Sequence, residues 1–333
     1  MLTYALDFFN RFPRKDDSRM QVLIATVNKG TSDKTADQIK ATMEAAYRVM
    51  YGDKGMLEFV TVKERPNSPR NIFGRMFETT HLHVAVSSRV LHVLSKEPEE
   101  VVENGWNKTK VWIEGSEREV VRAYAEQADK DLVEFLTCRR EELKIGGSLF
   151  MLIDGRPSGS DSQLGDDNDM NRKHPLNTYM DRAWQDLVDT EQVTVEERDR
   201  FNIPIYFRSQ EEVKAAIDRC GGFKMENMVN LKIADEMNTQ KTMWVDSPAL
   251  YGKHRALMVR AAVGNFIEAY LDKDKIAESD KIDKIAEGEE TEDEYSRTDV
   301  LFEQYASIAA NDTELINKAC FTQVIAVSVT RTC

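Results

Sequence analysis

Short apolar runs alternate with helical patterns along the first half of this chain, and that alternation constrains its fold more than any other feature. The runs are Gln21–Val27, Leu57–Val62, His81–Val86 and Ser148–Ile153. Their length and β-branched content are typical of buried strands. Apolar residues at helical spacing predict helices over Ser32–Tyr51 and Glu117–Leu143, the second ended by Gly146-Gly147. A short helix is expected over residues 87–96, capped by Ser87 or Ser88. Strands that alternate with helices predict an α/β fold with a doubly wound, mainly parallel sheet.

The second half of the chain breaks this alternation. Pro175 is expected to begin a helix after a polar loop at about residues 157–171. Ser209 and Glu212 have the spacing of a capping box for a later helix, which Gly221-Gly222 would end. Further elements are predicted at Phe223–Ile233 (strand), Leu250–Leu271 and Val300–Ala309 (helices) and about 320–330 (strand). We therefore expect about seven strands, the C-terminal one antiparallel, with an α-helical cap over the carboxyl ends of the strands.

The expected organisation is one core with insertions. The core takes residues 20–160, 221–234 and 318–333, and the cap takes 89–115, 161–220 and 245–315. A charged, low-complexity run over 272–299 is predicted to be a flexible surface insertion.

Composition excludes several classes of function. The formal net charge is −13 and the pI about 5.1, so a phosphate backbone is a poor partner. No apolar run approaches 18 residues, so no membrane span is predicted. Neither a signal peptide nor a CxxC spacing of the four cysteines is present, which favours reduced thiols and a cytoplasmic location.

Four blocks carry a family resemblance when they are taken in order. They are LHVAVSSRVLHVLSKEP, FLTCRREELKIGGSLFMLIDGRPS, RFNIPIYFRSQEEVKAAI and FTQVIAVSVTR. Together they resemble the salicylic acid, benzoic acid and theobromine methyltransferase family (SABATH). The resemblance implies a methyltransferase-like Rossmann sheet and methyl transfer from S-adenosylmethionine (SAM) to a small carboxylate or a ring nitrogen. It also leads us to expect a homodimer with a small-molecule acceptor as partner.

The resemblance places the cofactor site at motifs that match those of the family only in part. Gly30 takes the position of the family's Gly-rich turn, its first motif, and Glu64 takes the position of the acid that binds the ribose. In an alternative alignment register, this chain has no counterpart of the first motif. Asn71, in NIFGRMF, and the pair Ser87 and Ser88 complete the predicted cofactor site. No counterpart of the family's N-terminal strap is found before Met20. A catalytically inactive binding or dimer-partner protein is therefore the alternative function.

The acceptor and metal positions also follow from the resemblance. Arg89, His92 and Val93 fall where the family contacts its acceptor, and Arg89 could pair with a carboxylate. Asp199, the carbonyl of Phe201, and Asn202 fall on positions linked to Mg²⁺, while Arg122 takes the place of a further Asn ligand. The alternative is purely structural, with a turn at Asn202, a core aromatic at Phe201 and a surface acid at Asp199.

Overall fold

The computed structural model describes residues 20–24, 57–61, 72–113, 116–156, 175–235, 237, 241–272, 296–317 and 321–333, and parts of 37–49. The chain divides into two compact units, Met1–Met76 and Phe77–Cys333, each described separately below. Within the described residues no helix combines the length and apolar character that a membrane span requires.

The first unit contains a two-stranded parallel sheet. Strand β1 (Met20–Ile24) pairs with β2 (Leu57–Thr61), with Met20 opposite Leu57. Parallel strands need a crossover connection, and described residues between 37 and 49 are helical. The two predicted strands and a helical connection between them are therefore confirmed.

The second unit is built on a four-stranded sheet of order β3-β4-β6-β5. Its strands are β3 (Leu82–Ser88), β4 (Leu143–Gly155), β5 (Phe223–Ala234) and β6 (Phe321–Arg331). Strand β4 is parallel to β3 and antiparallel to β6, and β6 is antiparallel to β5. The predicted antiparallel C-terminal strand is confirmed. The described residues hold six strands in two sheets, so the count of about seven stays a prediction.

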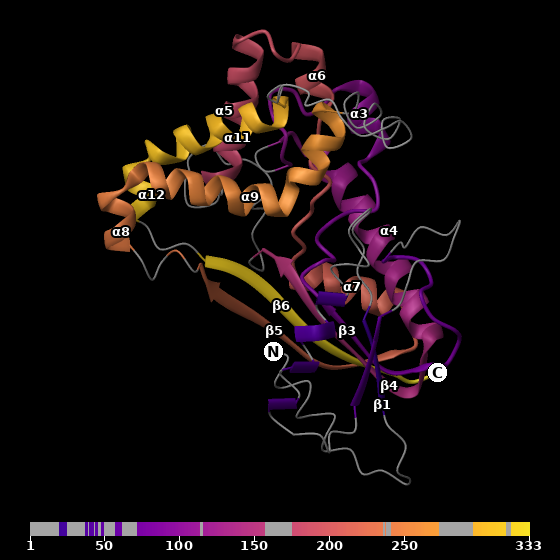
Figure 1. Ribbon diagram of the computed structural model, residues 1–333. Coiled ribbons are helices and arrows are strands. Elements are labelled where there is room, and N and C mark those ends of the chain that lie inside the picture. Colours follow the sequence, from indigo (N-terminus) through magenta and orange to yellow (C-terminus); the bar gives the residue numbers. More distant parts are fainter. Residues whose placement is uncertain are drawn as a thin grey trace, which may run out of the picture. The chain divides into compact units, whose positions relative to one another are not determined.

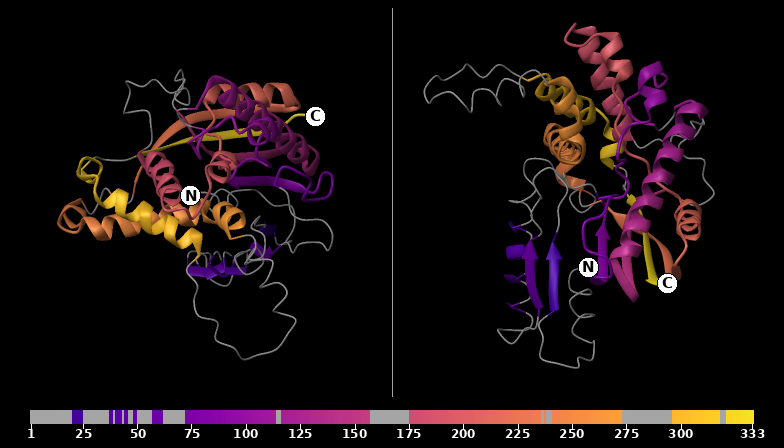
Figure 2. Two further views of the ribbon diagram at one scale, coloured as in Figure 1. Left: turned by 90° about the horizontal axis from the view of Figure 1, so that it is seen from above. Right: turned by 90° about the vertical axis from the view of Figure 1, so that its right-hand side faces the viewer.

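Two helices cover one face of this sheet (Figures 1 and 2). Helix α4 (Arg118–Glu142) connects β3 to β4, and α7 (Gln210–Cys220) packs against α4 and β5. The Ser209–Glu212 capping box of α7 is formed in both directions. Because α7 lies on the sheet, residues 210–220 do not belong to a cap, and the predicted cap range 161–220 is too long at its end.

The remaining helices gather beyond one end of the sheet (Figure 1) around a common apolar core that includes Trp184, Tyr305 and Ile267. They are α5 (Pro175–Asp189), α6 (Val195–Arg200), α8 (Lys241–Asp246), α9 (Pro248–Leu271), α11 (Arg297–Ala310) and α12 (Thr313–Asn317). A shorter helix, α3 (Glu99–Asn104), precedes α4. We call the group α5, α6, α8, α9, α11 and α12 the helical cap.

The two ends of the charged run belong to the folded cap. Asp272 is buried, and its carboxylate accepts hydrogen bonds from the backbone N–H groups of Arg297 (3.1 Å) and Thr298 (3.3 Å) at the start of α11. An insertion that spans all of 272–299 is therefore wrong at both ends. Residues 273–295 lie outside the described residues.

The helix predicted over residues 87–96 is wrong. Strand β3 continues through Ser88, and Arg89 still donates its backbone N–H to Leu152 of β4 (2.7 Å). Arg89 then turns the chain with φ of +53°, which no right-handed helix allows. Leu91 and Leu94 belong to an irregular loop, and both are buried.

Gly146 and Gly147 lie inside β4 rather than after α4. The register between β3 and β4 shifts at this point. Gly146 has φ of +78°, and a Cβ on Gly147 would lie 2.9 Å from the carbonyl oxygen of His83. The glycines therefore form a strand irregularity that allows a close backbone approach.

Candidate acceptor site at the strand ends

The residues expected to contact the acceptor lie in the loop that follows β3, residues 89–95. The backbone N–H of Leu94 donates to the carbonyl of Pro204 (2.8 Å), and the carbonyl of His92 accepts from Tyr206 (2.8 Å). Asp131 of α4, which is buried, accepts from the backbone N–H of Ser95 (2.8 Å). The loop is irregular, but its backbone polar groups have defined partners.

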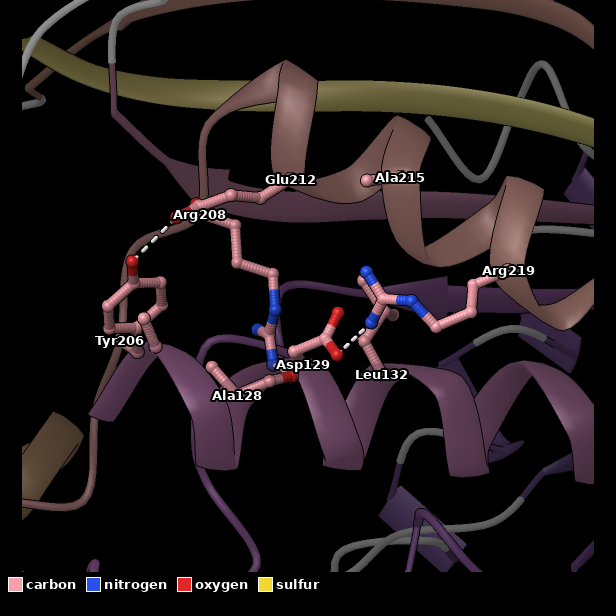
Figure 3. Close-up of a pocket in the computed structure, with 9 residues that line it drawn as sticks. Ala128, Asp129, Leu132, Tyr206, Arg208, Glu212, Ala215 and Arg219 are labelled. Carbon is pink, nitrogen blue, oxygen red and sulfur yellow. Dashed lines mark hydrogen bonds and ion pairs between the residues drawn. The ribbon is translucent and has the colours of Figure 1, made fainter. Parts of the chain in front are cut away.

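The side chain of Arg208 connects this loop to α4. Its side chain is buried, and its guanidinium donates to the carbonyl of Leu91 in the loop and to that of Ala128 in α4. Burial lowers the pKa of Arg208 to about 10, so it remains a cation at neutral pH. Figure 3 shows Arg208 reaching across to α4. One buried side chain thus ties the loop to the main helix of the unit.

A cavity of about 90 Å³ lies between α4 and α7 beside Arg208 (Figure 3). Two polar contacts border it, one between Tyr206 and Glu212 (2.6 Å) and one between Arg219 and Asp129. The predicted acceptor residues do not line this cavity.

The two predicted cofactor serines lie at the carboxyl end of β3. Ser87 is buried, and no described residue forms a hydrogen bond with its Oγ. A buried hydroxyl without a partner is costly unless a ligand satisfies it. Ser88 is exposed. The other predicted cofactor residues, Gly30, Glu64 and Asn71, lie outside the described residues.

Asp154 joins two of the acceptor candidates of the loop, Arg89 and His92. It follows the apolar part of β4 and is buried. Its Oδ1 accepts from Nε of Arg89 (2.8 Å), and its Oδ2 lies 3.5 Å from Nδ1 of His92. The Arg89 side chain remains 47% exposed. The site therefore has a cation that is fixed on one side and accessible on the other.

His92 is held in its neutral form. Burial is the main cause that lowers its pKa; the cations Arg89 and Arg208 lower it too, and Asp154 opposes them. The ring stacks on Phe207 with centroids 5.9 Å apart. Its Nδ1 is buried without a hydrogen bond.

Val93 lies beside the other acceptor candidates. It forms an isolated antiparallel bridge with Ile205 and packs against the apolar core of the helical cap. The structure thus brings Arg89, His92 and Val93 together in one loop between the strand ends and the cap.

The predicted metal residues form a separate cluster in which Oδ1 of Asp199 and Oδ1 of Asn202 already accept hydrogen bonds. Oδ1 of Asp199 accepts from the guanidinium of Arg198 (2.8 and 2.9 Å) and from the backbone N–H of Thr109 (3.1 Å). Oδ1 of Asn202, which is fully buried, accepts from Nδ2 of Asn107 (2.9 Å). Arg198 and Thr109 therefore compete with a divalent cation for Oδ1 of Asp199, and Asn107 competes for Oδ1 of Asn202. The magnesium site stays a prediction.

The rest of this cluster has structural roles. The ring of Phe201 is buried and stacks on Trp184 with centroids 4.6 Å apart. Arg122 is exposed on α4, where it pairs with Glu126 (3.5 Å). Among the described residues, no group of three or more His, Cys, Asp or Glu side chains could hold a metal.

Sequence reasoning missed Asp154 and Asn107. Asp154 could have been found, because a charged residue directly after an apolar strand lies where α/β sheets bind ligands. Asn107 lies 95 positions from its partner Asn202, and no local pattern reveals that pairing.

Comparison with known sequences places these residues in a family. The profile described as "SAM dependent carboxyl methyltransferase" matches residues 38–294. Gibberellic acid methyltransferase 1 of Arabidopsis thaliana is 49% identical over 266 residues, which cover 79% of this chain and 64% of that protein. Gibberellic acid methyltransferase 2 of the same plant is 38% identical over 327 residues, covering 89% and 79%. The match thus spans less than two thirds of the first relative's length.

A more distant relative and a solved structure agree with this. Indole-3-acetate O-methyltransferase 1 of Arabidopsis thaliana is 30% identical over 206 residues, covering 61% of this chain and 51% of that protein. The solved structure "Loganic acid methyltransferase with SAH" superposes with a TM-score of 0.66 at 21% identity, covering 100% of this chain and 91% of that one. The likeness confirms the methyltransferase-like fold.

Proposed function

Because the chain belongs to the SAM-dependent carboxyl methyltransferase family (SABATH), we propose that it transfers a methyl group from SAM to a carboxylate of a small molecule. The observation that carries this proposal is Arg89, a fixed and half-exposed cation at the carboxyl end of β3. Open α/β sheets bind ligands at that edge, and a guanidinium matches a carboxylate in charge and shape.

The described part of the cofactor site fits a bound ligand. Ser87, with its unpartnered buried hydroxyl, and the neighbouring Ser88 would hold SAM at the end of β3. When bound, SAM supplies an activated methyl group. The protein has then to bring the acceptor oxygen into line and exclude water.

A general base is not needed for this acceptor. A carboxylic acid is already ionised at neutral pH, and Arg89 would bind its anionic form. A ring-nitrogen acceptor is the weaker proposal, because a neutral ring nitrogen has no negative charge for the Arg89 cation to bind. The acceptors named for the relatives, gibberellic acid and indole-3-acetate, are the first acids to test.

Two measurements test the proposal. Calorimetry with S-adenosylhomocysteine (SAH) should show binding, and incubation with SAM and each acid should give a methyl ester by mass spectrometry. The methyl ester of each acid is the matched control and should not react. Absence of SAH binding at millimolar concentration would favour the alternative of a catalytically inactive binding or partner protein.

Arg89 has a matched control on the surface of α4. Arg89→Ala should weaken acceptor binding about ten- to a hundredfold, because a charge-assisted hydrogen bond contributes about 1.5–3 kcal/mol. Arg122→Ala removes an exposed arginine that pairs with Glu126 of the same helix and should leave acceptor binding unchanged.

The homodimer and the cytoplasmic location stay predictions. Light scattering on the purified protein tests the first, and imaging of a tagged chain tests the second.

A further inference from the structure

Asp154 is a buried acid whose two oxygens face two different residues of the acceptor loop. Oδ1 lies 2.8 Å from Nε of Arg89, and Oδ2 lies 3.5 Å from Nδ1 of His92. The Asp154 side chain is only 9% exposed, whereas that of Arg89 is 47% exposed.

Stability does not explain a carboxylate at this position. Burial of a carboxylate is costly, and an ion pair with a half-exposed arginine offsets little of that cost. The β4 residues that share a face with Asp154, Phe150 and Leu152, are apolar and half-buried. An apolar residue at position 154 would suit the strand at least as well.

The contact with Asp154 determines how Arg89 can meet a ligand. Asp154 takes the Nε–H, and the structure gives the two Nη groups no hydrogen bond among the described residues. A free arginine side chain has to be ordered before it can bind. With Nε fixed, the guanidinium plane is set in advance, and its two Nη groups remain for the two oxygens of a carboxylate.

The same acid acts on His92. A neutral imidazole carries its proton on one nitrogen only. A carboxylate facing Nδ1 favours the tautomer with the proton on that atom, and thereby the lone pair on Nε2.

From these contacts we infer that Asp154 is a positioning residue for the methyl acceptor. It fixes the Arg89 guanidinium, and with it the His92 ring, so that Arg89 presents both Nη groups to the carboxylate of a small organic acid. The inference rests on the proposed function.

The test compares Asp154→Asn, Arg89→Ala and the double variant with the unchanged protein. KM for the acid identified in the methyl-ester assay is measured at saturating SAM, and SAH affinity is measured by calorimetry. Asp154→Asn should raise KM about tenfold and change SAH affinity less than about twofold. The double variant should have the KM of Arg89→Ala alone, because Asp154 acts through Arg89. Arg122→Ala is the surface control.

A titration of His92 by NMR provides a readout that does not depend on turnover. The charged groups around this ring are Asp154 on β4, Arg89 on the loop and Arg208 before α7. Asp154 raises the pKa of His92, so Asp154→Asn should lower it further. If Asp154 had only a structural role, Asp154→Asn would not both lower the pKa of His92 and raise KM for the acid while leaving SAH affinity unchanged.

The failures can be told apart. If the unchanged protein binds no SAH and esterifies no acid, the proposed function fails and the inference fails with it. If the protein is active and Asp154→Asn keeps the original KM, or if its effect multiplies fully with that of Arg89→Ala, only the inference is overturned. Should Asp154→Asn not fold, Asp154→Ser keeps an oxygen for Nε and is measured in the same way.

Discussion

The acceptor loop and the turn after α6 both bring polar residues together, but they use them differently. Asn202 in the turn and Asp199 in the last turn of α6 have partners inside the protein. Ser87 at the end of β3 and His92 in the loop have buried polar atoms that receive no hydrogen bond from the described residues, and Arg89 stays half-exposed. Buried polar groups are normally satisfied. The comparison separates ligand-type residues whose hydrogen bonds are made inside the protein from an arginine that stays accessible to a ligand.

Among the variants that test this comparison, Arg208→Leu should change the stability of the protein most. Arg208→Leu leaves the carbonyls of Leu91 and Ala128 without their buried donor. The Leu91 carbonyl loses the partner that the structure gives it, at a cost of about 1–3 kcal/mol, whereas the Ala128 carbonyl keeps its hydrogen bond within α4 and loses a second one worth about 1 kcal/mol. The free energy of unfolding should therefore fall by roughly 2–4 kcal/mol. Urea unfolding measures it. Arg219→Leu, which removes an exposed ion pair with Asp129, should cost less than about 1 kcal/mol. Equal losses in the two variants would mean that the loop is not held by Arg208.

The turn can be tested through Asn202. Asn202→Ala leaves the buried amide of Asn107 short of one partner and should cost about 1–3 kcal/mol in urea unfolding. Added MgCl₂ should not change the Tm of the unchanged protein. If Mg²⁺ instead raises that Tm and the rise is lost in Asn202→Ala, the turn is a metal site after all.

Glu97, two residues after the acceptor loop, should give a smaller, pH-dependent effect. Burial raises the pKa of Glu97 to about 7. The folded protein therefore holds this proton more tightly than the unfolded chain, whose Glu titrates near 4.5. Stability falls as the pH rises from about 4.5 through 7. Glu97→Gln should raise the Tm at pH 8 and leave it nearly unchanged at pH 4. An equal rise at both pH values would contradict this assignment.

Ser87 should give no loss of stability. Ser87→Ala removes a buried hydroxyl that has no hydrogen-bond partner among the described residues, so the free energy of unfolding of the ligand-free protein should stay the same or rise by about 1–3 kcal/mol. SAH affinity should nevertheless fall about two- to tenfold, the effect of one lost hydrogen bond. Unchanged SAH affinity would remove Ser87 from the cofactor site.

Local signals predicted the regular parts of the fold well. The Ser209–Glu212 capping box and the strand at Phe321–Arg331 follow from short patterns and are confirmed. The helix over residues 87–96 failed because the apolar spacing of Val90, Leu91 and Leu94 imitates a helix, whereas the backbone of Arg89 has a positive φ. The spacing of apolar residues contains no information about that backbone torsion angle.

The site was predicted in part. The resemblance located Arg89 and His92, but the residue that pairs with Arg89 lies 65 positions away. Such a pairing depends on the parallel register of β3 and β4, which aligns Ser88 with Leu152. A single sequence does not contain that register.

The position of β6 has a consequence for synthesis of the protein. Strand β4 ends at Gly155, yet the strand that lies between it and β5 begins only at Phe321. At about 5–20 residues per second, the ribosome needs on the order of ten seconds or more to deliver it. During that time one edge of β4 has no native neighbour, and exposed strand edges attract other chains. We therefore expect the nascent chain to depend on chaperones until residue 331 has emerged.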